Sequence, residues 1–187
     1  KFIGIPNKYK QLEKTFQARQ KGTIIDDLGK DIIKHIPKYE AFCNIPSHTE
    51  YNMIMHNCFN VYAPFSYEPE NGKCDVSLEF VHHIFGEHFE YGLDYLQLLY
   101  QKPTQMLPIL CLISYDNNTG KSTFVKWLKA IFTQNCTIVG NDQFQDQFNG
   151  SWATKLIIAC EESFIEKQRV MEKIKQFSAG DKIPLRM

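Results

Sequence analysis

The sequence predicts an α/β protein whose core contains a parallel sheet, and three observations support this class. An apolar run at residues 107–113 leads into the loop sequence Thr-Gly-Lys-Ser-Thr at 119–123. The next stretch, 124–132, carries apolar residues at the i, i+3, i+4, i+7 spacing of a helix with one inward face. A further apolar run, 155–160, ends in two adjacent glutamates. Strand, crossover helix and strand in this order imply parallel strands.

The part of the chain before this core is predicted to be mostly helical. Residues 1–50 have a polar, helical pattern, whereas 51–63 are rich in aromatic and branched residues and read as one or two short strands. A loop follows from Pro64 to Gly72. Two helices are predicted around 76–85 and 93–100, and Pro103 closes the second. We therefore divide the chain into an N-terminal helical or α+β subdomain, 1–104, and a core, 105–187.

The core itself is predicted as an alternation of strands and helices. Its elements, in chain order, are a strand at 107–114, a helix at 124–132, a strand at 136–139, a short helix at 142–148, a strand at 155–160, a helix at 164–177, and a turn and strand at 178–187.

The loop before the first core helix has the residues of a phosphate-binding loop. Backbone N–H groups at a helix N-terminus attract phosphate oxygens, Lys121 supplies a cation for the terminal phosphates, and the Ser122 hydroxyl can ligate Mg²⁺. The pattern asks for glycine five residues before Gly120, where this chain has Tyr115. A side chain is tolerable there if φ is negative and turn-forming neighbours hold the loop. The predicted nucleotide-binding residues are Asn118, Thr119, Gly120, Lys121, Ser122 and Thr123. The alternative is a glycine-lysine turn that caps an ordinary helix.

The two glutamates after the 155–160 run supply the second half of the predicted chemistry. A buried strand would fix Glu161 and Glu162 at its carboxyl end, beside the phosphate loop. One carboxylate, assigned to Glu161, would hold Mg²⁺ with Ser122, and the other would activate the attacking water. With Lys121 they form the predicted catalytic set. The alternative is a strand that ends at an acidic turn.

Composition excludes some classes of function. Lysine and arginine together number 21, as do aspartate and glutamate, so no global basic field indicates a DNA-coating protein. Six cysteines occur without a Cys-x-x-Cys pair, as expected for reduced thiols in a cytosol. The longest apolar run is too short to span a bilayer. The first residue is Lys1 and no closing helix precedes Met187, which suggests a fragment of a longer protein.

Taken together, these elements resemble the superfamily 3 helicases, the ring-forming DNA motors of small viruses, phages and plasmids, and especially phage and plasmid primase-helicases. The resemblance covers roughly residues 55–187. It rests on 108–123, on Asn141-Asp142 with Gln147-Phe148-Asn149, on 155–162, and on the upstream block 92–101. It implies a P-loop NTPase core of the AAA+-like superfamily 3 type, with a parallel sheet that is incomplete at the C-terminus of this chain.

The resemblance also implies an activity and partners. The family hydrolyses ATP with Mg²⁺ and translocates on single-stranded DNA as a homo-oligomer, typically a hexamer, in the cytoplasm of the bacterial host. Lys173, Lys175 and Lys182 match the element that reaches DNA in the pore, although a solvated helix face explains them equally well. A primase or polymerase domain is expected in the parent chain. A sensor strand and an arginine finger are expected beyond Met187, so this fragment alone should hydrolyse ATP poorly or not at all.

Two other functions remain open at this stage. One is a nucleotide-regulated assembly or binding module without efficient hydrolysis, which Tyr115 and the missing sensor would both fit. The other is a small-molecule or nucleoside kinase, which shares the loop. Such a kinase usually closes a lid that carries arginines, and the chain has only Arg19, Arg169 and Arg186.

Overall fold

The computed structural model describes residues 2–6, 12–16, 19–65, 67–140, 143, 150, 152–160, 172, 174 and 175, the first two ranges by their backbone alone. The chain divides into two compact units, residues 1–41 and 42–187. The boundary predicted after residue 104 lies inside the second unit and remains an interpretation of the sequence pattern. No helix in the described part of the chain has the length and hydrophobicity needed to cross a membrane.

The first unit begins with an antiparallel strand pair. Strands β1 (Phe2–Pro6) and β2 (Leu12–Phe16) pair with Phe2 opposite Phe16. The helical pattern predicted for this segment is wrong. A spacing of four residues, as from Leu12 to Phe16, fits one turn of a helix and also two repeats of a strand. Aromatic and β-branched residues favour the strand, and a proline at its end interrupts a helix.

The helical part of the prediction is confirmed in the rest of the first unit. Helix α1 (Lys21–Leu28) is followed by a 3₁₀ helix, η1 (Lys30–His35). Gly29 separates them with φ 84°, and its N–H donates to the carbonyl oxygen of Ile25 at 2.8 Å. No residue from 19 to 41 is fully buried. The apolar side chains of residues 19–41 therefore stay partly open to solvent.

The second unit starts with a small sheet in the order β3–β5–β4. Its strands are β3 (Ala41–Cys43), β4 (Ile54–Met55) and β5 (Cys58–Asn60), and β4 and β5 are antiparallel. The prediction of one or two short strands within 51–63 is confirmed. Two turn residues join β4 to β5 with positive φ, 46° at His56 and 61° at Asn57. Such a pair matches the right-handed twist of a hairpin, and Asn tolerates it well.

Two buried asparagines connect the segments around this sheet. The Asn60 amide donates to the carbonyl oxygens of Ile45 and Asn52, and its oxygen accepts from the backbone N–H of Ile45 and Tyr62. The Asn135 amide donates to the carbonyl oxygen of Ala63 at 2.6 Å. Buried polar groups are stable only with such partners. The amides therefore fix the path of a segment that has little regular structure.

The two predicted helices of the middle region are confirmed. They are α2 (Asp75–Phe85) and α3 (Phe89–Gln101), joined by the short 3₁₀ helix η2 (Gly86–His88). Gly92 lets them approach closely, because a Cβ at this position would lie 2.5 Å from Cγ of Phe85. Helix α3 ends before Pro103, as predicted.

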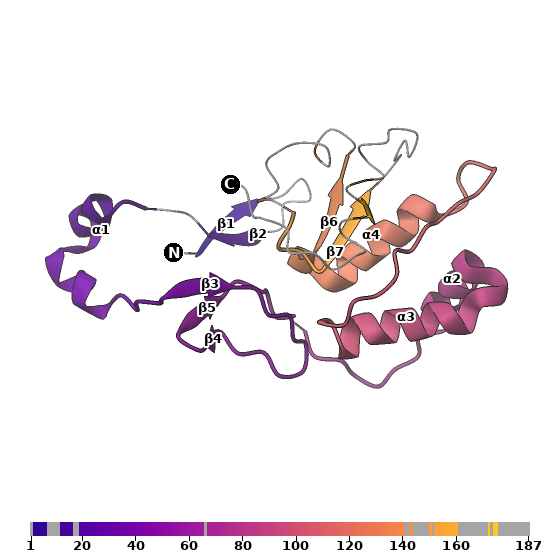
Figure 1. Ribbon diagram of the computed structural model, residues 1–187, viewed down its shortest axis with the longest axis horizontal. Helices are drawn as coiled ribbons and strands as arrows, with labels where there is room; N and C mark the ends of the chain where they lie inside the picture. Colours follow the sequence, from indigo (N-terminus) through magenta and orange to yellow (C-terminus); the bar gives the residue numbers. More distant parts are fainter. Residues whose placement is uncertain are drawn as a thin grey trace. The chain divides into compact units, whose positions relative to one another are not determined.

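The last described elements form the core of the second unit. Helix α4 (Lys121–Phe132) continues into η3 (Thr133–Asn135) and strand β6 (Cys136–Val139). Strand β7 (Ile157–Cys160) runs parallel to β6, with Cys136 opposite Ile157, and α4 lies against this pair in Figure 1. The parallel pairing predicted for these strands is confirmed. The buried centre consists of Leu99, Phe124, Leu128, Phe132 and Cys136.

One predicted strand is not formed. Residues 107–114, expected to be a strand of the parallel sheet, are extended but belong to no strand, and β6 and β7 form a two-stranded sheet in the described region. Leu110 and Leu112 pack on the core, whereas Ile109 and Ile113 are 51% and 89% exposed. High β-propensity does not make a strand without a partner, because strand stability comes from cross-strand contacts. The elements predicted at 142–148, 164–177 and 178–187 fall almost entirely outside the described residues.

Candidate phosphate-binding loop

The loop at 114–120 leads directly into α4, and Gly120 is the last loop residue before the helix begins at Lys121. Its φ of 91° and ψ of −1° lie in the left-handed region that glycine adopts easily. A Cβ at Gly120 would also lie 3.3 Å from Cδ1 of Ile84 on α2, tighter than most real contacts. The backbone conformation therefore favours glycine, and a Cβ would in addition force the Ile84 side chain to shift.

The start of α4 leaves backbone donors free of helical partners. The first helical hydrogen bond runs from the Phe124 N–H to the carbonyl oxygen of Gly120 at 2.8 Å. The N–H groups of Lys121, Ser122 and Thr123 precede this bond, so they belong to the orphan donors that every helix start presents. Such a helix end attracts anions, because its unpaired N–H groups and its dipole both favour negative charge.

The Lys121 ammonium lies over the loop and is surrounded by oxygen atoms. Its Nζ donates to the Ser114 hydroxyl, to the Thr119 hydroxyl at 3.0 Å, and to the carbonyl oxygen of Asp116 at 3.4 Å. Ser114 also donates to the carbonyl oxygen of Asp116 at 2.8 Å, and its oxygen lies 3.0 Å from that of Thr119. The cation is therefore held at the mouth of the loop by neutral oxygens, without a carboxylate partner among the described residues.

The departure from the glycine pattern at Tyr115 has a simple structural account. Tyr115 is not among the non-glycine residues with positive φ, and its side chain is fully exposed at 108%. Asn118, three residues later, takes the positive φ of 60°. The condition that makes a side chain tolerable at this corner is therefore met, and asparagine supplies the left-handed turn.

Helix α2 contributes a contact that the sequence did not indicate. Nε2 of His83 donates to the carbonyl oxygen of Thr119 at 3.2 Å. His83 lies next to Ile84, which packs against Gly120. The sequence pattern did not mark His83 as a site residue, because a contact over 36 positions leaves no local signal. Ser114 was also missed as a partner of Lys121.

A hollow of about 620 Å³ opens beside the loop. One wall comes from the end of α2 with His83 and Ile84, and another from Leu110 and Leu112 of the extended segment. Thr119 and Lys121 lie at its polar end. The cavity thus has an apolar body and a single cationic end, the arrangement expected of a site for a small anionic ligand.

The other predicted site residues are only partly placed. Ser122 and Thr123 lie in the first turn of α4 and are exposed, so their hydroxyls are accessible. Ser122 therefore fits the Mg²⁺ role, since Mg²⁺ prefers oxygen ligands that leave room for water. Lys175 is exposed and helical. Glu161, Glu162, Lys173 and Lys182 lie outside the described residues, although Glu161 directly follows the end of β7 in the sequence.

The comparisons with known proteins give one match. The family described as "Family of unknown function (DUF5906)" matches residues 112–187, which include the loop, α4, β6 and β7. No curated protein and no solved structure matches the chain.

Proposed function

We propose that this chain is the nucleotide-binding part of an ATP-dependent DNA helicase of the superfamily 3 kind, belonging to a phage, plasmid or other mobile element. The observation that carries the proposal is the joint position of Gly120 and Lys121. The glycine turns the chain into a helix whose first N–H groups have no partner within the helix, and the ammonium lies over the same loop. Phosphate oxygens are the ligands that such a set of donors favours.

Each group would have a separate role with ATP. Backbone N–H groups at the start of α4 would bind phosphate oxygens, and Lys121 would exchange its loop oxygens for the terminal phosphates. Ser122 and Glu161 would hold Mg²⁺, which neutralises charge on the phosphates when bound. Glu162, the other carboxylate, would orient and deprotonate the attacking water. These steps together describe a hydrolase that works mainly by positioning and charge neutralisation.

The wider proposal concerns partners and compartment. The chain would act as a homo-oligomer, with a hexameric ring as the favoured form, in the cytoplasm of a bacterial host. Single-stranded DNA would pass along Lys173, Lys175 and Lys182, and a primase or polymerase domain would belong to the same parent protein. We expect slow turnover from the 187-residue chain alone, because within the described part of the chain residues 107–114 have no strand partner that would hold the loop rigid.

The alternative is a nucleotide-regulated assembly module without efficient hydrolysis. One observation favours it: the segment leading into the loop is unpaired on both edges within the described region. Such a loop can bind a nucleotide and still fail to position an attacking water. Nucleotide binding without turnover in the parent protein would select this alternative.

A binding experiment tests the proposal directly. Mg²⁺-ATP affinity is measured by fluorescence with a labelled ATP analogue, in the wild type, Lys121→Ala and Lys126→Ala. Lys126 is an exposed lysine of the same helix and loses the same charge, so it is the matched control. We expect Lys121→Ala to lose at least about tenfold in affinity, the effect of one charge-assisted contact. Equal binding by Lys121→Ala and Lys126→Ala would exclude a phosphate role for this loop.

A further inference from the structure

Charge is distributed unevenly between the two units. Residues 1–41 contain nine lysine and arginine residues against five aspartate and glutamate residues, a net charge of +4. Residues 42–187 carry the compensating −4, so the neutral total hides the difference. A local positive surface attracts polyanions irrespective of the net charge of the whole protein.

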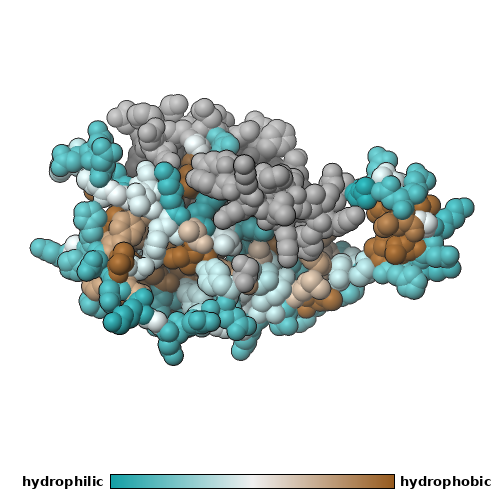
Figure 2. Space-filling model, turned by 180° about the vertical axis from the view of Figure 1, so that it is seen from behind, coloured by the Kyte–Doolittle hydropathy of each residue, from teal (hydrophilic) through white to brown (hydrophobic). Residues whose placement is uncertain are grey.

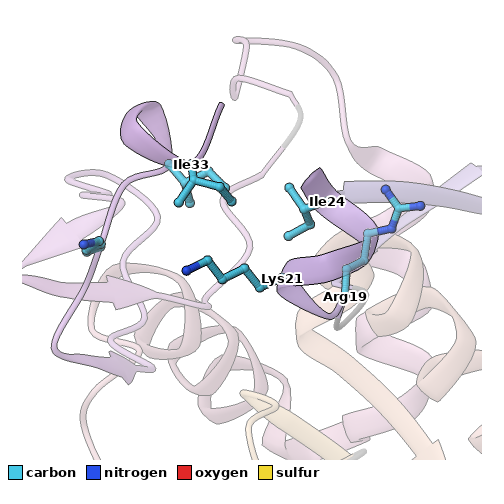
Figure 3. Close-up of a pocket in the computed structure, with 6 residues that line it drawn as sticks. Arg19, Lys21, Ile24 and Ile33 are labelled. Carbon is cyan, nitrogen blue, oxygen red and sulfur yellow. The ribbon is translucent and has the colours of Figure 1, made fainter. Parts of the chain in front are cut away.

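The first unit also contains a hollow of about 300 Å³ whose lining combines cations and isoleucines. Figure 3 shows Lys21 extending from the start of α1, below Ile24, toward the side on which Ile33 lies. Figure 2 shows a hydrophobic area with a hydrophilic rim over α1 and η1. The full lining is Arg19, Lys21, Ile24, Ile33, Ile36 and Lys38.

The cations of this hollow differ in whether they have partners. Arg19 is bound to Asp27 of α1 at 2.8 Å, so its charge is used within the unit. Lys34, outside the hollow, is paired with Asp31 at 3.0 Å. No carboxylate in the described part of the chain lies within ion-pair distance of Lys21 or Lys38. The hollow therefore has two uncompensated ammonium groups and an apolar floor.

We propose that this hollow binds single-stranded nucleic acid, with a phosphodiester held by Lys21 and Lys38 and a sugar or base against the isoleucines. Uncompensated lysines attract a phosphate backbone without reading its sequence. An apolar floor accepts any base, because every base has an apolar face. A hollow of this size is at the lower limit of small-molecule pockets and so suits one unit of a polymer. The inference rests on the proposed helicase function, which supplies the single strand.

The test uses the 187-residue chain and a fluorescein-labelled dT oligonucleotide without nucleotide. Anisotropy titrations at several salt concentrations compare the wild type with Lys21→Gln/Lys38→Gln. The control, Lys73→Gln/Lys102→Gln, removes two exposed lysines of the second unit. The plot of log K against log salt has a negative slope, and each lost phosphate contact reduces its magnitude by about 0.7 for single strands. The magnitude should therefore be smaller by about 1.4 in the double variant. Affinity at low salt should fall roughly tenfold or more, and the control should match the wild type.

A third variant examines the apolar floor. Ile36 is 39% exposed, so Ile36→Ser should leave the fold intact, which far-UV circular dichroism checks. We expect weaker binding with an unchanged salt slope, because an apolar contact releases no counterions. Wild-type affinity and slope in the Lys21/Lys38 variant would overturn the proposal. So would equal competition by polyglutamate, which would indicate an acidic protein partner, or by anionic lipid vesicles, which would indicate a membrane surface.

The outcome is separable from that of the proposed function. ATP binding by the wild-type chain tests the loop, whereas oligonucleotide binding in the absence of ATP tests the hollow. Lysine-dependent oligonucleotide binding by a chain that binds no ATP would remove the helicase function and keep the nucleic-acid site. ATP binding with no lysine-dependent oligonucleotide binding would keep the proposed ATP site and remove the nucleic-acid site.

Discussion

Nε2 of His83 on α2 lies 3.2 Å from the carbonyl oxygen of Thr119, the residue before the glycine of the candidate phosphate loop. The neighbouring side chain, Ile84, packs against Gly120 from the same helix. Helix α2 therefore supports the loop with one polar and one apolar contact. The loop conformation depends on a helix 36 positions earlier in the chain, outside the segment that carries the sequence pattern.

Removal of the His83 contact should weaken nucleotide binding without unfolding the protein. His83→Ala leaves the Thr119 carbonyl without this donor and loosens the loop, at a cost of about 1 kcal/mol, or roughly fivefold in Kd. His82→Ala is the control, because the His82 ring packs against Phe89, 5.1 Å between centroids. ATP titrations of the two variants compare them directly. Equal affinities in both would show that the His83 contact does not shape the site.

Gly120→Ala should disrupt the loop for two independent reasons. Its φ of 91° is strained for any residue with a Cβ, and the new methyl group would press on Ile84. We expect a loss of about 1–2 kcal/mol in the free energy of unfolding and a larger loss of ATP affinity. Gly22→Ala is a matched control, since its Cβ would meet nothing within 4 Å in helix α1. There, alanine should stabilise by about 0.5–1 kcal/mol. Urea unfolding measures the free energy of unfolding of both variants. Equal changes of the same sign in the two variants would contradict the assigned conformations.

Stability should depend on pH through His48. Its ring stacks on both Phe65 and Tyr100, with centroids 4.3 and 5.3 Å away, and burial lowers its pKa from 6.5. The unfolded state therefore takes up a proton more readily than the folded state. The stability that the neutral His48 ring contributes to the folded state is complete above about pH 6.5. It is lost as the pH falls toward the lower pKa of the folded state.

Urea unfolding between pH 5 and 8 measures this effect. The urea concentration at the unfolding midpoint of the wild type should decrease as the pH is lowered below about 6.5. His48→Phe keeps an aromatic ring in the stack but cannot titrate, so the midpoint of this variant should decrease less over the same pH range. The substitution also removes the hydrogen bond to the Tyr62 hydroxyl, 3.2 Å from Nε2, which lowers stability at every pH equally. An unchanged pH dependence in His48→Phe would exclude His48 as the source.

The sequence predicted those features whose signals are local. The apolar spacing from Phe124 to Ile131 was sufficient for α4. The branched residues of β6 and β7 indicated two strands, and their parallel direction followed from the predicted alternation of strands and helices. The β1–β2 pair was missed because the spacing of Leu12 and Phe16 fits both periodicities. In the candidate site, the Gly-Lys pair was predictable from its pattern. The roles of His83 and Ser114 were not, since each depends on how the folded chain brings distant atoms together.

The segment 107–114 is where the burial predicted from the sequence differs most clearly from the burial in the structure. As a central parallel strand it would be buried on both faces, and a charge on either face would be costly. In the structure only one face is covered. Leu112 packs on the core with Leu110, whereas Ile113 is 89% exposed. Tyr95 holds the start of the segment by donating to the carbonyl oxygen of Pro108 at 3.1 Å.

Two lysine substitutions should therefore behave differently in this chain. Leu112→Lys places an ammonium group against the apolar core and should lower the free energy of unfolding by about 2–4 kcal/mol. Ile113→Lys should change it by less than about 0.5 kcal/mol, because the side chain already faces solvent. Urea unfolding of the two variants gives the comparison. Comparable destabilisation by both would mean that both faces are covered in solution, so that residues 107–114 are buried as the sequence pattern alone predicts.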